Sequence, residues 1–315
     1  MTSIEQTAGF SDPGRKRTRN EDSYVLAPPL FAVADGMGGA QAGEVASRLA
    51  AAAVEDTDHG DLRGEQGVAA LIQEANRRVF ERSTEDPSVS GMGTTMTLAL
   101  VEAGDVSIGH VGDSRAYLVR GGSLSQLTED HSLVNELVKS GRLSREEAEI
   151  HPQRSVITRA LGTDPDVDAD IFTVHARPGD VFLLCSDGLS SMVSDEAILE
   201  VVEVNRDDLD RAARELVKAA NRGGGDDNIT VVAFGFQDPA DPGETARMAA
   251  TSGTVAPDEE DTLDGIPAVQ APEELGGGDD APRPEARRRR RRLLLLIAIL
   301  IALAAVGVAL WSALR

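Results

Sequence analysis

The sequence predicts an α+β fold, a four-layer αββα sandwich in which two antiparallel β-sheets carry helices on their outer faces. Several apolar runs have the length and composition of buried strands. Short spacings such as Ala103-Gly104-Asp105 and Gly121-Gly122 suit hairpins, which favour antiparallel pairing over βαβ units. Two longer segments show the helical period of amphipathic helices that cover a sheet.

The expected elements alternate in blocks along the chain. Strands are expected at residues 30–34, 96–101, 106–111, 116–119, 180–186 and 229–236. One helical face carries Val68, Leu71, Ile72, Ala75 and Val79, and a later one carries Leu209, Ala212, Ala213, Leu216 and Ala220. Residues 132–150 form a more polar helical stretch, in which a helix is expected to end at Gly141.

Four short acidic motifs lie at the ends of strand-like runs and are the main functional signal. They are Ala34-Asp35-Gly36, Gly112-Asp113-Ser114-Arg115, Ser186-Asp187-Gly188 and Asp226-Asp227-Asn228. A single Asp-Gly pair is usually only a turn. A carboxylate at the exit of a buried strand, however, must be paired, solvated or bound to a cation, because burying the bare charge is costly. Since hard divalent cations prefer oxygen ligands, we expect the four motifs to form one metal site.

With these motifs the chain resembles the metal-dependent serine/threonine protein phosphatases of type 2C, particularly their bacterial, membrane-anchored members. The resemblance covers roughly residues 6–236 and starts at an Arg-x-x-Asn-Glu-Asp opening. The matching segments, in the family's order, are Arg17 to Asp22, Ala34 to Gly39, Gly91 to Thr95, Gly112 to Arg115, Cys185 to Leu189 and Asp227 to Val231.

The resemblance implies a centre of two Mn²⁺ or Mg²⁺ ions, with a weaker third ion. Asp35 would bridge the two ions, and the Gly36 carbonyl would help to hold the second. Asp187 and Asp227 would complete the coordination of the first ion. Asp113 matches the ligand of the third ion, which Asp187 would share.

The same resemblance assigns roles around the metals. Arg17 would bind the substrate phosphate, and its planar donor fork suits that task. Glu21 and Asp22 would act mostly through metal-bound waters, and Ser155 would be a polar contact of a mobile flap. Several eukaryotic relatives carry a His as general acid where this chain has Met37. A water held by the metals is therefore the expected proton donor.

The predicted function is hydrolysis of phosphoserine and phosphothreonine on proteins, in opposition to bacterial Ser/Thr kinases. Two bridged metals can activate one water or hydroxide for in-line attack, so that no phosphoenzyme is needed. One alternative is an inactive relative that only binds phosphoproteins, which the retained Asp35, Asp187, Asp227 and Arg17 argue against. Another is a divalent-cation-sensing module, in which Arg17 would have no purpose.

Composition limits the other functional classes. The net charge of −22 argues against nucleic acid as a partner. Cys185 is the sole cysteine, so no intramolecular disulfide can form, and its place in an apolar strand indicates packing. His110 alternates with Val106 and Ile108, which indicates a packed or rim residue rather than a ligand. Residues 1–14 lack the apolar stretch of a signal peptide, and export by that route is not expected.

The C-terminal quarter predicts a membrane tether for a monomeric catalytic domain at residues 1–237. Residues 238–286 contain thirteen Asp or Glu and seven prolines without an aromatic residue, a composition typical of a disordered linker. Residues 287–292 are six arginines, and residues 293–314 carry no charge. Such a helix is about 33 Å long, enough to cross the bilayer. The basic flank predicts a cytoplasmic catalytic domain, with membrane Ser/Thr kinases and their targets as expected partners.

Overall fold

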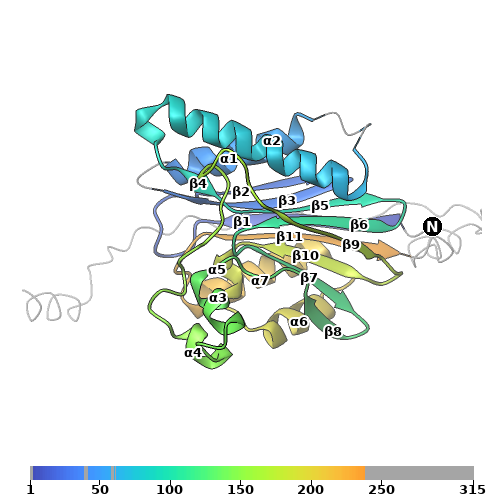
Figure 1. Ribbon diagram of the computed structural model, residues 1–315. Coiled ribbons are helices and arrows are strands. Elements are labelled where there is room, and N and C mark those ends of the chain that lie inside the picture. Colours follow the sequence, from blue (N-terminus) through green and yellow to red (C-terminus); the bar gives the residue numbers. More distant parts are fainter. Residues whose placement is uncertain (1–2, 39–41, 58–59, 61, 238–315) are drawn as a thin grey trace, which may run out of the picture. The chain divides into compact units, whose positions relative to one another are not determined.

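The structure is a computed structural model that describes residues 3–38, 42–57, 60 and 62–237 of the chain. Within these residues the chain forms two antiparallel β-sheets that face each other, with helices on both outer faces (Figure 1). The predicted sandwich is therefore confirmed for this part of the chain.

One sheet has five strands in the order β1-β11-β10-β7-β8. Its centre is the apolar strand β10, which pairs with β11 on one side and with β7 on the other. β1 pairs with β11 from Ser3 opposite Gln237 to Asp12 opposite Ile229. The strands are β1 (Ser3–Asp12), β7 (Arg115–Arg120), β8 (Ser123–Gln126), β10 (Val181–Cys185) and β11 (Ile229–Gln237).

The second sheet runs in the order β2-β3-β5-β6-β9, and the short strand β4 pairs with the end of β3. The register between β2 and β3 places Asp22 directly opposite Asp35, which brings two of the predicted acidic residues together. The strands are β2 (Asp22–Ala27), β3 (Leu30–Met37), β4 (Gly93–Thr94), β5 (Met96–Glu102), β6 (Asp105–Val111) and β9 (Asp170–His175).

Helices cover the outer face of each sheet. α1 (Ala42–Glu55) and α2 (Gly64–Glu85) pack on the six-stranded sheet, and α7 (Leu209–Gly223) packs on β1 and β11. α6 (Asp195–Val204) lies against α7 and β8. The shorter helices are η2 (Pro87–Val89), α3 (Leu133–Lys139), α4 (Arg145–Glu149) and α5 (Asp187–Ser190).

Apolar clusters fill the spaces between these layers. Two of the clusters join a sheet to its helices, and another lies between the two sheets. In that middle cluster Phe234 stacks on Phe31 and Phe182, with ring centroids 4.2 and 5.2 Å apart. Stacked aromatic pairs add specific contacts to the burial of apolar area, so the two sheets are held in one relative position. The ends of their strands are thereby fixed with respect to each other.

The expected strands and both amphipathic helices are present within a few residues of their predicted ends. The hairpin at Ala103-Gly104 has positive φ at both residues, as has the one at Gly121-Gly122. The polar stretch at residues 132–150 is two helices, α3 and α4, because Gly141 takes a φ of 69° after the first of them. β1, β2, β9 and α1 are among the elements that the sequence patterns did not indicate.

The predicted linker, arginine block and membrane-spanning segment, residues 238–286, 287–292 and 293–314, lie outside the described residues. Among the helices that the structure does describe, none combines the length and the apolar character needed to cross a membrane.

Candidate metal centre

The four acidic motifs come together at one edge of the sandwich. Asp35 lies near the end of β3, Asp187 opens α5 directly after β10, and Asp227 precedes β11. The hydrogen bond from Ser186 N to Thr230 O, 3.1 Å, continues the pairing of β10 and β11 to this edge. The structure therefore assembles, at one place, carboxylates that come from distant parts of the sequence.

Asp35 is held by its backbone at the centre of the cluster. Its N–H donates to Thr95 Oγ1 at 2.9 Å, and its carbonyl accepts from Thr95 N and Thr94 Oγ1. The residue keeps some surface open to solvent, but its carboxyl group is desolvated. That desolvation, followed by repulsion from Asp22, Asp187 and the other carboxylates, raises the pKa of Asp35 well above its ordinary value.

The resemblance implies that Asp22 acts through metal-bound water, and the structure places its carboxyl group in a desolvated position. Its Oδ2 accepts hydrogen bonds from Thr230 Oγ1 at 2.6 Å and Ser186 Oγ at 2.8 Å. Its Oδ1 is buried and has no hydrogen-bond partner among the described residues. Desolvation raises the pKa of Asp22 to about 7, although the two hydroxyl groups act against the increase. A buried carboxylate oxygen without a partner is costly, so this atom calls for a cation or a water.

Asp187 and Asp113 are also destabilised as anions. Desolvation and then repulsion from Asp227 raise the pKa of Asp187 to about 6. Desolvation and then repulsion from Asp187 raise the pKa of Asp113 to about 7. After Asp187, a Cβ on Gly188 would lie 2.0 Å from the carbonyl oxygen of Asn228, so only glycine allows this close approach of α5 to the residue before β11.

Gly36 needs its lack of a side chain for a similar reason. A Cβ at this position would lie 2.1 Å from the carbonyl oxygen of Gly43 in α1. The Gly36 N–H donates to the Glu21 carbonyl at 3.2 Å, which joins the end of β3 to the residue before β2. A Cβ on Gly43 would in turn lie 2.7 Å from the carbonyl oxygen of Gly36. Glycine at positions 36 and 43 thus lets α1 approach the acidic edge closely.

Arg17 lies at the rim of the cluster and pairs with one of its carboxylates. Its Nη2 donates to Asp227 Oδ2 at 2.7 Å, and its side chain is 52% exposed. This hydrogen bond is the main reason that the pKa of Arg17 is raised. Arg17 is therefore close to the predicted metal ligands, in a position from which it can exchange Asp227 for another anion.

Asn228 organises this part of the site, a role that the sequence patterns did not assign. Its Nδ2 donates to the carbonyls of Pro13 and Arg19 at 3.0 and 2.8 Å, while its Oδ1 accepts from Glu21 N at 2.7 Å. The buried amide thereby fixes the loop that carries Arg17 against the residues that precede β11. Its position directly after a ligand-like Asp is the signal that could have suggested this role.

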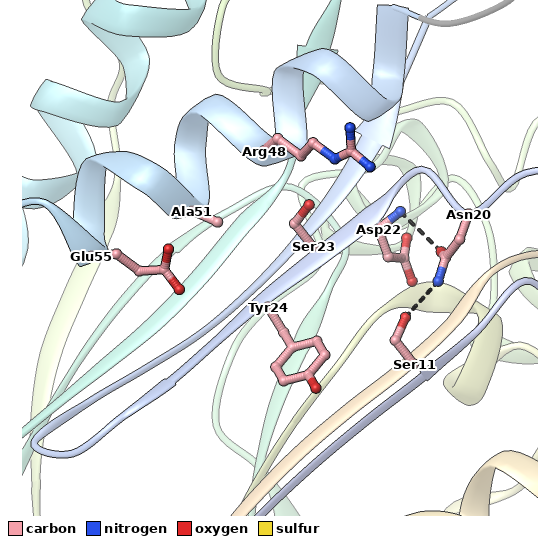
Figure 2. Close-up of a pocket in the computed structure, with 8 residues that line it drawn as sticks. All are labelled: Ser11, Asn20, Asp22, Ser23, Tyr24, Arg48, Ala51 and Glu55. Carbon is pink, nitrogen blue, oxygen red and sulfur yellow. Dashed lines mark hydrogen bonds between the residues drawn. The ribbon is translucent and has the colours of Figure 1, made fainter.

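A small hollow of ≈ 380 Å³ lies on another side of Asp22, between β1, β2 and α1 (Figure 2). In it Asn20 Nδ2 donates to Ser11 Oγ at 2.7 Å, and Asn20 Oδ1 accepts from Asp22 N at 3.2 Å. Ser11 Oγ in turn lies 2.7 Å from Thr230 Oγ1, which donates to Asp22. These contacts hold the Asp22 carboxyl group from behind.

A larger groove of ≈ 1110 Å³ connects the cluster to the flap, which we define as residues 132–156. The base of the flap is closed by a hydrogen bond from Leu133 N to Val156 O at 2.9 Å. Ser155 lines the groove together with Asp113 and Asp187, so these three predicted residues share one surface. Arg17 and Asp35 are not among the residues that line it.

The donor chemistry of the cluster suits a divalent cation. Its side chains offer carboxylate oxygens, which Mn²⁺ and Mg²⁺ accept. Within the part of the chain that the structure describes, however, no three His, Cys, Asp or Glu side chains already stand as a set of metal ligands. Desolvation first and repulsion between carboxylates second raise the pKa values of Asp22 and Asp35, and Oδ1 of Asp22 has no partner among the described residues. Bound cations would stabilise these carboxylates in their ionised form.

Neither His110 nor Cys185 belongs to the cluster, in agreement with the expectation that they are not metal ligands or catalytic groups. His110 is buried, with Nδ1 3.0 Å from Thr97 Oγ1 and Nε2 3.1 Å from the Glu129 carbonyl. Desolvation lowers the pKa of His110 to about 4. Cys185 is buried in β10, and desolvation raises the pKa of its thiol to about 12, as expected for a packing residue.

Comparison with known proteins decides the family. The model of the family described as Protein phosphatase 2C matches residues 15–229, more than half of the chain. The chain belongs to the protein phosphatase 2C family. The serine/threonine phosphatase stp of Listeria monocytogenes is 40% identical over 233 residues, which cover 70% of this chain and 92% of the relative.

A mycobacterial relative is similar over a longer stretch. The serine/threonine protein phosphatase PstP of Mycobacterium tuberculosis is 42% identical over 264 residues, which are 82% of this chain. The match spans 50% of that relative's own length. These findings confirm the predicted family and, for the matched residues, the predicted class of enzyme.

Solved structures agree with the fold and with the expected metals. The crystal structure of the M. tuberculosis phosphatase PstP/Ppp has a TM-score of 0.70 and 43% identity, covering 75% of this chain and 100% of the solved one. A PstP catalytic domain in complex with two manganese ions has a TM-score of 0.68 and 40% identity, covering 76% and 100%. The predicted cofactor is thus found in a relative of the same fold.

Proposed function

We propose that the protein is a metal-dependent phosphatase that removes phosphate from phosphoserine and phosphothreonine on other proteins. The observation that supports this most strongly is the carboxylate cluster at one edge of the sandwich, in which desolvation first and repulsion from neighbouring carboxylates second raise the pKa values of Asp35 and Asp187. An arginine at its rim adds a group for phosphate. The match to the protein phosphatase 2C family connects this arrangement to a known chemistry.

Within this proposal the metal ligands are those implied by the resemblance. Asp35 and the Gly36 carbonyl would help to hold two ions, with Asp35 shared between them, and Asp187 and Asp227 would complete the coordination of the first ion. Asp113, which is close enough to Asp187 for that carboxylate to raise its pKa, takes the third. When bound, Mn²⁺ or Mg²⁺ would polarise the phosphoryl oxygens and lower the pKa of coordinated water toward about 7.

The remaining roles belong to side chains around these ligands. Arg17 holds the phosphate, because a dianion can compete with Asp227 for the guanidinium and two of its N–H groups can bind two phosphoryl oxygens. Asp22 and Glu21 support the site from behind, Asp22 through Ser186 and Thr230. Ser155 contacts the substrate from the flap side of the groove.

Release of inorganic phosphate from a phosphothreonine peptide tests the proposed activity. With Mn²⁺ the full-length protein should release phosphate in repeated turnovers, and an excess of chelator should stop the reaction. Phosphopeptide binding without phosphate release would instead support an inactive binding protein. A response to Mn²⁺ with neither binding nor release would support a cation sensor.

We further propose that the catalytic domain, residues 1–237, is tethered to the cytoplasmic face of the cell membrane. The support is in the sequence of residues 238–286, 287–292 and 293–314, an acidic linker followed by six arginines and an uncharged span. Such a tether would place the domain near membrane Ser/Thr kinases and their targets. Fractionation of cells tests this, since a full-length protein found in the soluble fraction would contradict the tether.

A further inference from the structure

The groove beside the metal centre is lined by both basic and acidic residues. Its basic residues are Arg115, Lys139, Arg145 and Arg154, and the last three belong to the flap. The lining also includes the segment that leads from α5 into α6, with Asp195 and Glu196. Which of these charges are free for a substrate depends on the pairs that they form within the protein.

Several acidic residues of the groove outside the metal centre already have partners. Asp130 accepts from Arg115 at 2.9 and 2.6 Å, and Glu129 pairs with Lys139. Asp195 accepts from a tyrosine hydroxyl at 3.3 Å. Two of the four basic residues, Arg115 and Lys139, are used in these pairs.

Arg145 and Arg154 are different, because neither side chain forms an ion pair or hydrogen bond with a residue that the structure describes. Both are exposed and both line the groove. The pKa of Glu146 is lowered mainly by hydrogen bonds at the start of α4, and Arg145 contributes last. In a chain with 53 acidic residues against 31 basic ones, two groove arginines without a partner among the described side chains favour an anionic partner.

The flap residues of the groove also offer apolar contact. Ile150 is 81% exposed and lines the groove with Val134 and Val138. A small phosphoester has no group to cover these side chains, whereas a peptide chain has. The groove also includes Asp113 and Asp187, so a peptide whose phosphate is at the metal centre can extend along the flap.

We propose that Arg145 and Arg154 select substrates that carry a second anionic group near the phosphoresidue being hydrolysed. This inference rests on the proposed phosphatase function and concerns which phosphoproteins that site prefers. The second group is a phosphate or a carboxylate. A phosphate carries a charge of about −1.5 to −2 against −1 for Asp, so doubly phosphorylated segments are preferred.

The test compares four phosphothreonine peptides of one sequence with the full-length protein and Mn²⁺. The four peptides differ at one test position, which carries a second phosphothreonine, Asp, Ala or Lys. In successive sets the test position lies one to five residues before or after the phosphothreonine that is hydrolysed. For the best position, kcat/KM should fall in that order. Two exposed charge pairs should give a total advantage of about three- to tenfold over Ala. Because exposed pairs are screened, the advantage should shrink in about 0.5 M salt.

The double variant Arg145→Gln/Arg154→Gln should reduce the advantage to about one while it hydrolyses the Ala peptide and para-nitrophenyl phosphate normally. Arg142→Gln is the matched control, since Arg142 is an exposed flap arginine that does not line the groove. It should keep the full advantage.

Three results would overturn the inference. They are equal kcat/KM on all four peptides at every position, an advantage that survives in the double variant, and an advantage that Arg142→Gln abolishes as well. In each of these cases the peptides are still hydrolysed, so the proposed function stands. If no phosphopeptide is hydrolysed at all, the proposed function fails and this inference fails with it.

Discussion

The metal-free protein should become more stable as the pH is lowered from about 8 to about 6.5. Asp22 and Asp113 have pKa values of about 7 in the folded protein, where an ordinary Asp has 3.8. A group whose pKa is raised by folding stabilises the folded state fully below its unfolded pKa. That stability is lost as the pH rises through the folded value. Protonation of these two carboxylates therefore favours folding.

The expected magnitude follows from these values. For a folded pKa of about 7, this change of pH contributes about 0.8 kcal/mol for each group, or about 1.6 kcal/mol for Asp22 and Asp113 together. At about 2–4 °C per kcal/mol for a domain of this size, these two groups alone should raise Tm by about 3–6 °C. His110, whose pKa folding lowers from 6.5 to about 4, opposes this gain, because the unfolded chain takes up a proton there more readily. Between about pH 8 and pH 6.5 it offsets about 0.4 kcal/mol, which leaves a rise in Tm of about 2–5 °C, and the offset grows below about pH 6.5.

Differential scanning fluorimetry in excess chelator measures this effect. Asp22→Asn should remove more than half of the rise, whereas Glu81→Gln, which removes an exposed carboxylate on α2, should leave it intact. Saturating Mn²⁺ should raise Tm more at about pH 8 than at about pH 6.5, because bound metal requires ionised carboxylates. A Tm that stays level or falls between about pH 8 and pH 6.5 in chelator would refute the reasoning.

Three further predictions concern other parts of the chain. Arg17→Ala should raise KM for phosphopeptides without weakening Mn²⁺ binding, whereas Lys16→Ala, which removes a neighbouring ion pair with Asp226, should change KM little; calorimetric Mn²⁺ titration and steady-state kinetics of both variants check this. Deleting residues 287–315 should leave peptide hydrolysis unchanged and move the protein to the soluble fraction, and loss of peptide hydrolysis would show that the tail belongs to the catalytic fold. Cys185 should resist iodoacetamide in the native protein because its thiol is buried with a pKa of about 12, and rapid labelling before unfolding would contradict its packing role.

The central strands could be predicted because their residues alone carry the signal. β10 is the run Val181 to Cys185, buried at every position, and a continuous apolar run of that length predicts a buried strand. β1 has a mixed composition, since its residues at the sheet edge are mostly half-buried. Its place is determined by pairing with the distant β11, which no local pattern shows. The Ala-rich α1 was missed for a different reason, because its small side chains give only a weak helical period.

In the candidate site too, local sequence patterns predicted some residues, whereas the positions of others depend on long-range contacts. Motif order was enough to select Asp35, Asp187 and Asp227, because each lies beside a strand that could be recognised. The depth of Asp22 could not be inferred, since it depends on hydroxyl groups from Ser186 and Thr230 on two other strand ends. The pairing of Arg17 with Asp227 is likewise a long-range contact, because the fold brings together residues from the two ends of the domain.

The most direct test of the account is Mn²⁺-dependent phosphopeptide hydrolysis by the wild-type protein and by Asp35→Asn. Asp35 is the one residue proposed to contact both ions, and the neutral amide removes a charge from the desolvated centre of the cluster with little change in size. The account predicts that the variant folds and loses nearly all turnover at saturating Mn²⁺. If it kept more than about a tenth of wild-type kcat/KM, a loss of less than about 1.4 kcal/mol of transition-state stabilisation, the carboxylate cluster would not be the catalytic metal centre.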